Sequence, residues 1–355
     1  MPKFTFFAGL TLGRVRTVVQ VLMLFVTVYG AALVGVYTAD KISNALPALS
    51  CAYDQADGGY CVLIPSQHVL HHRVGEAILK AKAVTFDIVL PFLMMVVSFF
   101  AFYFFLGKAF CGWVCPLGTL QDWVSRIGRR FQRPLHRADG KNLSRIRAVK
   151  WIFLSVLVLG LPLATGLGVT THSLGNPWCD VCPSRIATTL LTGSTGELAL
   201  PMGDGVRMAL HAFGNAAFGF IAIAALSIRL PFCRVCPLLA WNALFQRFSP
   251  MRLVKEEKRD KCDKCGICRE ACPMDIREIH TESGRKAFHE DCTLCGRCAE
   301  FCPEDGLIAI KFGPWKLFAS SRDYYKARVR GELPHGEVKP IRIVKKADRA
   351  ASDAA

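Results

Sequence analysis

Four long apolar stretches, separated by polar or charged segments, dominate the first two thirds of the chain. They cover Thr17–Tyr37, Thr85–Gly107, Val149–Val169 and Met208–Leu230. Each can cross a hydrocarbon core of about 30 Å as a helix, because such a helix needs roughly 20 residues. A helix also pairs its own backbone groups, which lipid cannot do. The pattern therefore predicts an α-helical membrane protein, with a four-helix transmembrane domain in residues 1–247.

The first apolar stretch has an alternative interpretation as a secretory signal. Its apolar run is longer than a usual signal core, and no convincing small-residue cleavage site follows it. We therefore expect this stretch to remain in the protein as an uncleaved helix.

The pattern after the fourth stretch predicts a second domain. Ser249-Pro250 ends the apolar region, and the charged stretch Lys255–Lys261 follows it. Residues 248–315 are expected to form a small α+β domain. Residues 316–355 are basic and show little apolar periodicity, so we expect a flexible cytoplasmic tail with one short helix near Arg322–Arg330.

The composition agrees with a membrane protein, and the charge distribution predicts its orientation. Hydrophobic residues make up 52% of the 355 positions, and the mean hydropathy is +0.30. The net charge is +16, from 44 basic and 28 acidic residues, and the basic residues gather between Arg126 and Lys150. By the positive-inside rule, both termini and the second domain are cytoplasmic. The basic segment indicates contact with anionic lipid rather than nucleic acid.

Eight of the 16 cysteines form two runs with the spacing C-x2-C-x2-C-x3-C-P. This spacing binds [4Fe–4S] clusters, with three cysteines of a run on one cluster and the fourth on the other. The alternatives are a zinc site or disulfides, but zinc needs neither the crossed spacing nor the closing prolines. We therefore expect a ferredoxin-like domain with two clusters. Their predicted ligands are Cys262, Cys265, Cys268 and Cys302 for the first cluster, and Cys292, Cys295, Cys298 and Cys272 for the second.

The other eight cysteines accompany the apolar stretches in a repeated pattern. A motif that begins Phe-Cys and ends Val-Cys-Pro-Leu follows the second stretch at Phe110 and recurs after the fourth at Phe232. The repeat predicts two similar helical hairpins, related by a rough twofold axis along the membrane normal. The predicted topology sorts these cysteines into an inner set, Cys111, Cys115, Cys233 and Cys236, and an outer set, Cys51, Cys61, Cys179 and Cys182.

The two sets have different chemical interpretations because their compartments differ. Disulfides are disfavoured on the reducing cytoplasmic side, so the inner set is either a cofactor or transient metal site or a group of structural thiols. The proline after each second cysteine exposes backbone N–H groups that lower the thiol pKa. The outer set suits disulfides, such as Cys51–Cys61, or free thiols. The C-x2-C-P form of Cys179 and Cys182 leaves a metal or cluster site open.

Histidines near the predicted outer helix ends offer another kind of site. Haem is disfavoured, because it needs two axial histidines that face each other inside the bundle and none is expected mid-membrane. His68 and His72 are instead expected on a short interfacial helix, Ser66–Lys82, in a copper-binding or proton-accepting role. Together with Asp87 they are candidate proton acceptors at a quinol site. The alternative for Asp87 is stabilisation of a helix N-terminus.

With these motifs the chain resembles the membrane ferredoxins NapH and MauN, a 4Fe-4S polyferredoxin family related to the membrane half of NosR and to CcoG. The resemblance covers about residues 15–315 and rests on the eight ferredoxin cysteines and the motif Cys111-Gly112-Trp113-Val114-Cys115-Pro116. It implies quinol oxidation or a related electron-delivery step at the bacterial inner membrane. Two features depart from the family: Cys233 and Cys236 are separated by two residues instead of three, and the outer cysteines are additional.

Three functions agree with these features. The first is an electron carrier, or quinol dehydrogenase component, between the membrane quinone pool and a ferredoxin or periplasmic redox protein. The second is a maturation factor that uses ferredoxin electrons to reduce copper or a disulfide. The third is a passive membrane anchor for a partner ferredoxin. The expected cofactors are two [4Fe–4S] clusters, with a further cluster or copper as an additional candidate, and quinone is the expected diffusible substrate.

Overall fold

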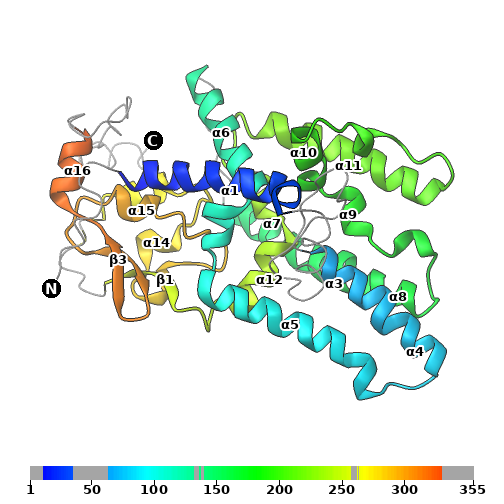
Figure 1. Cartoon of the computed structure of the whole chain (residues 1–355). Coiled ribbons are helices and arrows are strands. Elements are labelled where there is room, and N and C mark those ends of the chain that lie inside the picture. Colours follow the sequence, from blue (N-terminus) through cyan, green and yellow to red (C-terminus); the bar gives the residue numbers. More distant parts are fainter. Residues whose placement is uncertain are drawn as a thin grey trace. The chain divides into compact units, whose positions relative to one another are not determined.

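The computed structural model describes residues 11–34, 63–131, 136, 140–256, 262 and 264–329 (Figure 1). The chain divides into two compact units. The first unit contains the chain before Thr17 and the chain from Arg252 onward, apart from residues 290–295. The second unit contains Thr17–Met251 together with residues 290–295. Cys51 and Cys61, expected in the outer set, lie outside the described residues.

Four helices in the described part of the chain are long and apolar enough to cross a membrane, which confirms the four predicted spans. One of them is not uniformly α-helical: Leu143–Gly166 contains a π-helical segment at Phe153–Gly160. The elements of the four spans are α1 (Leu12–Val34), α5 (Phe86–Leu106), α7 (Gly140–Ile152) continued through the π-helical segment into α8 (Leu161–Gly166), and α11 (Gly205–Ala224).

These spans expose large apolar side chains. Phe25, Met94 and Phe220 leave 57%, 61% and 73% of their surface uncovered. A continuous apolar surface is unfavourable in water and favourable against lipid tails. The exposure is therefore what a multi-pass membrane protein requires.

Short helices follow or precede the spans and carry most of the chemistry. The helix expected at Ser66–Lys82 is present as one continuous helical segment, with a π-helical middle at Val69–Gly75. A third π-helical segment, Phe110–Val114, contains Cys111. The α-helical elements are α3 (Ile64–His68), α4 (Glu76–Ala81), α6 (Pro116–Arg130), α9 (Pro177–Val181), α10 (Pro183–Leu191) and α12 (Pro237–Phe245).

Aromatic side chains form the centre of the second unit. The rings of Phe99 and Trp241 lie 5.6 Å apart in an edge-on arrangement, and those of Tyr103 and Phe245 lie 6.1 Å apart and stacked. Such pairs contribute about 0.5–1.5 kcal/mol each beyond the burial of their area. They join α5, which precedes the motif of Cys111, to α12, which follows the motif of Cys236.

The first unit combines a three-stranded sheet with short helices. The strands β1 (Met251–Lys255), β2 (Ile308–Phe312) and β3 (Trp315–Ala319) lie in the order β1-β2-β3, and β2 and β3 are antiparallel. The helices are α13 (Ile267–Ala271), α14 (Glu278–Thr281), α15 (Arg297–Glu300) and α16 (Arg322–Val329).

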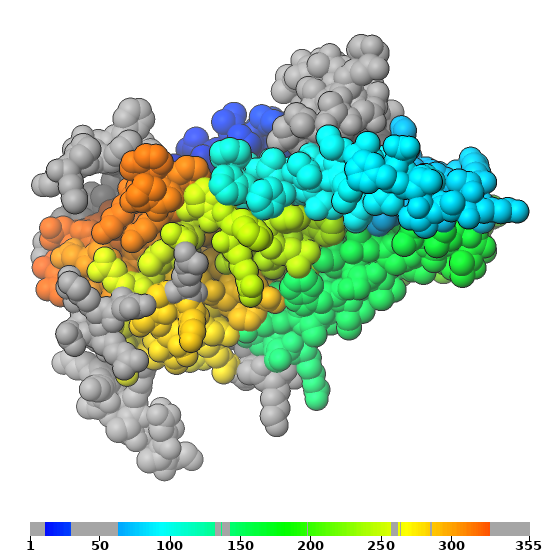
Figure 2. Space-filling model, turned by 90° about the horizontal axis from the view of Figure 1, so that it is seen from below, coloured from blue at the N-terminus to red at the C-terminus, as the bar shows by residue number. Residues whose placement is uncertain are grey.

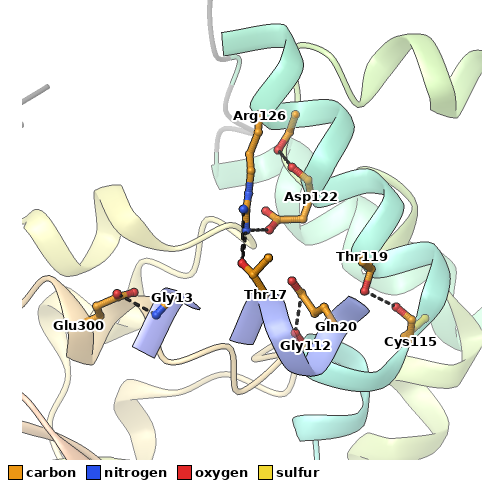
Figure 3. Close-up of polar contacts among 10 residues, drawn as sticks. Gly13, Thr17, Gln20, Gly112, Cys115, Thr119, Asp122, Arg126 and Glu300 are labelled. Atoms are coloured by element: carbon orange, nitrogen blue, oxygen red, sulfur yellow. Dashed lines mark hydrogen bonds and ion pairs between the residues drawn. The ribbon is translucent and has the colours of Figure 1, made fainter. Parts of the chain in front are cut away.

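The domain boundaries differ from the prediction at both ends of the chain. The tail predicted from residue 316 begins later, because Trp315–Ala319 completes the sheet by pairing with β2. The short helix predicted near Arg322–Arg330 is present as α16. The residues before Thr17 group with the first unit. There the Gly13 N–H donates to Glu300 Oε1 at 3.0 Å (Figure 3), and the Tyr324 hydroxyl also contacts Glu300 Oε1 at 3.2 Å.

Candidate functional site

Four cysteines of the first unit surround one cavity, and they are the ligands predicted for the first cluster: Cys262, Cys265, Cys268 and Cys302. Their thiols are free, and Cys265 is exposed whereas Cys302 is buried. A [4Fe–4S] cluster is held by four cysteine thiolates. The residues around this cavity therefore fit such a cluster.

Burial raises the pKa of the Cys268 and Cys302 thiols in the protein without iron. It raises the pKa of Cys268 to about 12, although the ammonium group of Lys255 acts in the opposite direction. Lys255 is itself fixed, because its Nζ donates to the Ile279 carbonyl at 2.8 Å. Iron must displace the thiol protons, so cluster binding releases protons and contributes to folding.

The two cysteine runs share an unusual backbone conformation. In the first run Lys264 has φ +49° and Gly266 has φ +78°, and in the second Leu294 has φ +52° and Gly296 has φ +74°. The left-handed region costs a residue with a side chain about 1–2 kcal/mol. That both runs adopt it at corresponding positions indicates that each loop is wound in the same way, with its cysteines turned to one side.

The predicted ligands of the second cluster are Cys272, Cys292, Cys295 and Cys298. Cys292 and Cys298 are buried, and Cys272 and Cys295 are partly exposed. This ligand set stays a prediction from the sequence.

A second cysteine-lined cavity lies inside the second unit. We call it the thiol cavity; its cysteines are Cys111, Cys115, Cys182, Cys233 and Cys236. Phe110, Trp178 and Phe232, all buried, form part of its apolar wall. The structure thus brings the four cysteines of the predicted inner set together, and it adds a fifth.

The fifth cysteine belongs to the predicted outer set. Cys182 was expected on the outer side, apart from Cys111 and Cys236. It lies instead on the same cavity, because α9 and α10 fold back into the core, where Trp178 and Pro183 are buried. The length of an apolar span gives no information about a short helix that returns into the bundle.

Three helices begin at the thiol cavity. Cys115, Cys182 and Cys236 are the N-cap residues of α6, α10 and α12, and a proline occupies the first turn of each helix. Proline suits this position because its missing N–H has no intrahelical partner there. The free N–H groups and the dipoles of three helix N-termini favour a negatively charged group at the cavity.

Burial nevertheless dominates the protonation of the thiols. It raises the pKa of Cys111 to about 12 and that of Cys236 well above the usual value, and neighbouring thiols add to the increase. At Cys236 burial therefore outweighs the lowering of the thiol pKa that exposed N–H groups would cause. A metal or cluster would supply the charge that makes thiolates favourable here.

Two buried glutamines make equivalent contacts with the cysteine motifs. Gln121 Nε2 lies 3.7 Å from the Cys233 Sγ, and Gln121 Oε1 accepts from the Phe232 N–H at 3.0 Å. Gln67 Nε2 donates to the Cys179 Sγ at 3.1 Å, and its Oε1 accepts from the Trp178 N–H at 3.1 Å. Each glutamine stands 112 residues before its cysteine. The structure therefore contains the same clamp twice.

Sequence reasoning missed these glutamines, although the sequence contains a signal for them. The motif P-x-C-x-V-C-P occurs at Pro177–Pro183 and again at Pro231–Pro237. A leucine four residues before each glutamine, Leu63 or Leu117, also lines the thiol cavity. An alignment of the chain with itself would have related Gln67 to Gln121 and Cys179 to Cys233.

Residues 290–295, which carry Cys292 and Cys295, pack against the motif of Cys111. The Trp113 Nε1 donates to the Leu294 carbonyl at 3.0 Å. A Cβ at Gly112 would lie 2.3 Å from the Thr293 carbonyl oxygen, so only glycine allows this approach. Thr293 itself lines the thiol cavity.

Buried charges hold the segment 290–295 in place. Lys150 forms ion pairs with Glu290, at 2.7 Å, and with Asp291, and Arg147 lies 2.7 Å from the Asp291 carboxylate. The buried ammonium of Lys108 interacts electrostatically with both Cys292 and Cys111, and burial lowers its pKa to about 8. A cation between two cysteine motifs favours electron-rich, negatively charged ligand sets on both sides.

Contacts from α1 fix the other side of this motif (Figure 3). The Gln20 side chain donates to the Gly112 carbonyl at 3.1 Å. Arg126 lies 3.5 Å from the Thr17 hydroxyl and 2.8 Å from the Asp122 carboxylate. The loop that carries Cys111 is thus held between α1, α6 and residues 290–295.

The structure brings together two of the three candidate proton acceptors, the two histidines, but not Asp87. The rings of His68 and His72 lie 4.7 Å apart, and His72 Nδ1 is 2.7 Å from the Glu76 carboxylate. Burial lowers the pKa of His68, and the neighbouring His72 contributes. Asp87 is exposed in the first turn of α5, and the contacts described for this part of the chain include none between it and either histidine.

Two protein-family models match the regions of these sites. A 4Fe-4S binding domain matches residues 88–134 and again residues 210–256, which contain Cys111 and Cys115 in one copy and Cys233 and Cys236 in the other. A 4Fe-4S dicluster domain matches residues 246–308, which contain the two C-x2-C-x2-C-x3-C-P runs.

Curated relatives cover about half of the chain. An uncharacterized protein of Methanocaldococcus jannaschii is 27% identical over 48% of this chain and 61% of its own length. The regulatory protein NosR of Stutzerimonas stutzeri is 26% identical over 49% of this chain and 20% of its own. YccM of Escherichia coli, named as a candidate electron transport protein, is 25% identical over 52% and 46%. The chain therefore spans less than two thirds of these relatives. No solved structure matches it.

Proposed function

We propose that the chain exchanges electrons between quinol and a redox partner. The proposal builds on the finding that it is an iron–sulfur electron-transfer protein of the membrane, a ferredoxin related to the membrane half of NosR. The observation that carries the proposal is the packing of residues 290–295 on the motif of Cys111. Cysteines of the second ferredoxin run and the wall of the thiol cavity meet in one unit there. Electrons can pass between the second ferredoxin run and the thiol cavity without crossing solvent.

The thiol cavity supplies a second redox position in this proposal. Cys111, Cys115, Cys233 and Cys236 would hold a cluster or a soft metal ion, which supplies one-electron transfer when bound. The 4Fe-4S binding domain that matches both of these cysteine pairs supports this assignment. The hydrocarbon core is about 30 Å thick, so a position inside the bundle shortens the distance that electrons must cover.

Oxidation of one quinol releases two electrons and two protons. Two [4Fe–4S] clusters accept one electron each, so one turnover fills both. The protons need an acceptor at a water-accessible position. Asp87, exposed at the start of α5, and His68 remain our candidates, on chemical grounds rather than from a shared contact.

The test uses the purified full chain in liposomes with a reduced short-chain quinol. We expect quinol to bleach the visible absorption of the iron–sulfur clusters, and an oxidised quinone to restore it. As a control, dithionite must reduce the same clusters, which shows that they are intact. Clusters that dithionite reduces and quinol leaves oxidised at all quinol concentrations contradict the proposal.

The orientation predicted from the basic residues remains part of the proposal. We expect a reporter fused after Ala355 to be active in the cytoplasm and one inserted near Asp57 to be active outside, because Lys and Arg gather between Arg126 and Lys150. Alkaline phosphatase and a fluorescent protein at each position give opposite signals. If both reporters showed the opposite activities, the predicted orientation of the bundle would be wrong.

A maturation factor that reduces copper is the second candidate. Five thiols around one apolar cavity suit a soft ion such as Cu(I) better than a hard cation. The metal content of the purified protein distinguishes the two functions. Two clusters account for about eight irons and eight sulfides; a clear excess of both supports a third cluster, and stoichiometric copper supports maturation. The third candidate, a passive anchor, predicts neither an excess of iron and sulfide nor bound copper.

A further inference from the structure

Three histidines and a glutamate form a compact group at one end of the second unit. The ligand atoms of His71, His72, Glu76 and His172 all lie within 4.8 Å of one another. We propose that these four side chains bind one divalent first-row transition-metal ion. The site is distinct from the thiol cavity, because its ligand group contains no cysteine and none of its four residues lines that cavity.

The π-helical segment Val69–Gly75 places three of the ligands on one face. In this segment the Glu76 N–H bonds to the His71 carbonyl, which is the i→i+5 pattern of a π-helix. In an α-helix residues three and four positions apart share a face, and the π-helical turn also brings together residues five positions apart. The Glu76 Oε1 is accordingly 2.7 Å from His72 Nδ1 and 3.8 Å from His71 Nε2. π-Helical turns occur frequently at functional sites.

A contact between two glycines brings in the fourth ligand. A Cβ at Gly75 would lie 2.6 Å from the Gly166 Cα, and a Cβ at Gly166 would lie 2.4 Å from the His71 carbonyl oxygen. The helix through Ile64–Ala81 therefore crosses the end of α8 in direct backbone contact. In Figure 2 the light-blue surface of this helix adjoins a green surface. The chain continues from α8 to His172, whose ring lies 4.9 Å from that of His71.

The ligand chemistry indicates the class of metal. Imidazole suits Zn²⁺, Cu²⁺, Co²⁺ and Fe²⁺, and one carboxylate completes a four-ligand set. The group contains no thiolate, so it does not favour Cu⁺. The ring centroids of His71 and His72 lie 3.9 Å apart. A cation bound to both rings would stabilise this close approach.

Burial and access also suit a bound ion. His71 is 2% exposed, and its Nε2 lies 3.8 Å from the Glu76 carboxylate. On the other side the exposed His172 borders a polar pocket with His71, Ser173 and Asn176. An ion can therefore enter from this pocket while His71 anchors it from the protein side.

The test is a titration of the purified, cluster-loaded full chain with Co²⁺, and a competition of Zn²⁺ against a chromophoric chelator. Ligand-field absorption of Co²⁺ without thiolate charge-transfer bands identifies nitrogen and oxygen ligands and excludes the cysteines. We expect one equivalent to bind in this way. The single variants His72→Ala and His172→Ala should each weaken Zn²⁺ binding by at least about tenfold, since loss of even an outer partner costs that much.

The matched control is His68→Ala, which removes a ring 4.7 Å from His72 that does not belong to the ligand group. It should bind Zn²⁺ with the affinity of the wild type. Because His172 is exposed, its replacement should leave the fold intact, which unchanged iron and sulfide contents would verify. Wild-type protein that binds Co²⁺ only through thiolates, or His172→Ala protein that binds Zn²⁺ as the wild type does, would overturn the proposal.

Discussion

Cys265→Ser is expected to remove one [4Fe–4S] cluster and leave the other. Cys265 lies on the cavity of the first unit with Cys262, Cys268 and Cys302, and the spacing makes it the middle ligand of its run. We expect the iron content to fall from about eight to about four per chain. The first unit should also unfold at lower denaturant concentration, because cluster binding contributes to the folding of so small a domain.

Iron and acid-labile sulfide analysis, together with electron paramagnetic resonance of the reduced protein, measures this loss. Lys264→Ala changes the neighbouring exposed residue and keeps the thiol, so it should retain both clusters. Cys295→Ser should remove the other cluster and leave the first. If Cys265→Ser protein shows the resonance signals of two clusters at full intensity, the ligand assignment is wrong.

The transmembrane spans and the ferredoxin cysteines were predictable because their signals are local. A span needs about 20 consecutive apolar residues, and Phe86–Leu106 shows this without reference to any other segment. The grouping of Cys262, Cys265 and Cys268 likewise follows from spacing within one loop. Their proximity to Cys302 followed from the crossed ligation of such runs, which is a property of the motif.

The composition of the thiol cavity was not predictable from topology alone. Cys182 was assigned to the outer side because it follows the third span, yet α9 and α10 return into the core. Trp178 is a visible reason: a buried tryptophan beside Cys179 has no place on a solvent-exposed loop. A short re-entrant helix leaves no long apolar run, so hydropathy cannot detect it.

The histidine cluster shows a second limit of sequence reasoning. His68 and His72 were selected because they are four residues apart, which is the α-helical spacing. The π-helical turn instead places His71 and His72 beside Glu76. His172 comes from a distant segment, and only the contact between Gly75 and Gly166 brings it near.

Single substitutions in the thiol cavity are expected to have nearly the same effect as double ones. If Cys111, Cys115, Cys233 and Cys236 serve one redox centre, Cys111→Ala or Cys233→Ala alone abolishes it, and combining them adds little. Groups that act as a unit are strongly non-additive. The measurement is the rate at which quinol-derived electrons reach a soluble acceptor in liposomes, with the cluster content of each variant checked first.

Cys179→Ala provides the matched control, because Cys179 is buried and belongs to the same motif as Cys182 but does not line the cavity. It should lose its contact with Gln67 and keep electron transfer. Cys182→Ala decides between the two groupings of the cysteines. A loss as large as that of Cys111→Ala makes Cys182 part of the centre; a wild-type rate confines the centre to the four cysteines that the sequence had grouped. Additive losses for Cys111 and Cys233 would mean that the cavity holds independent structural thiols.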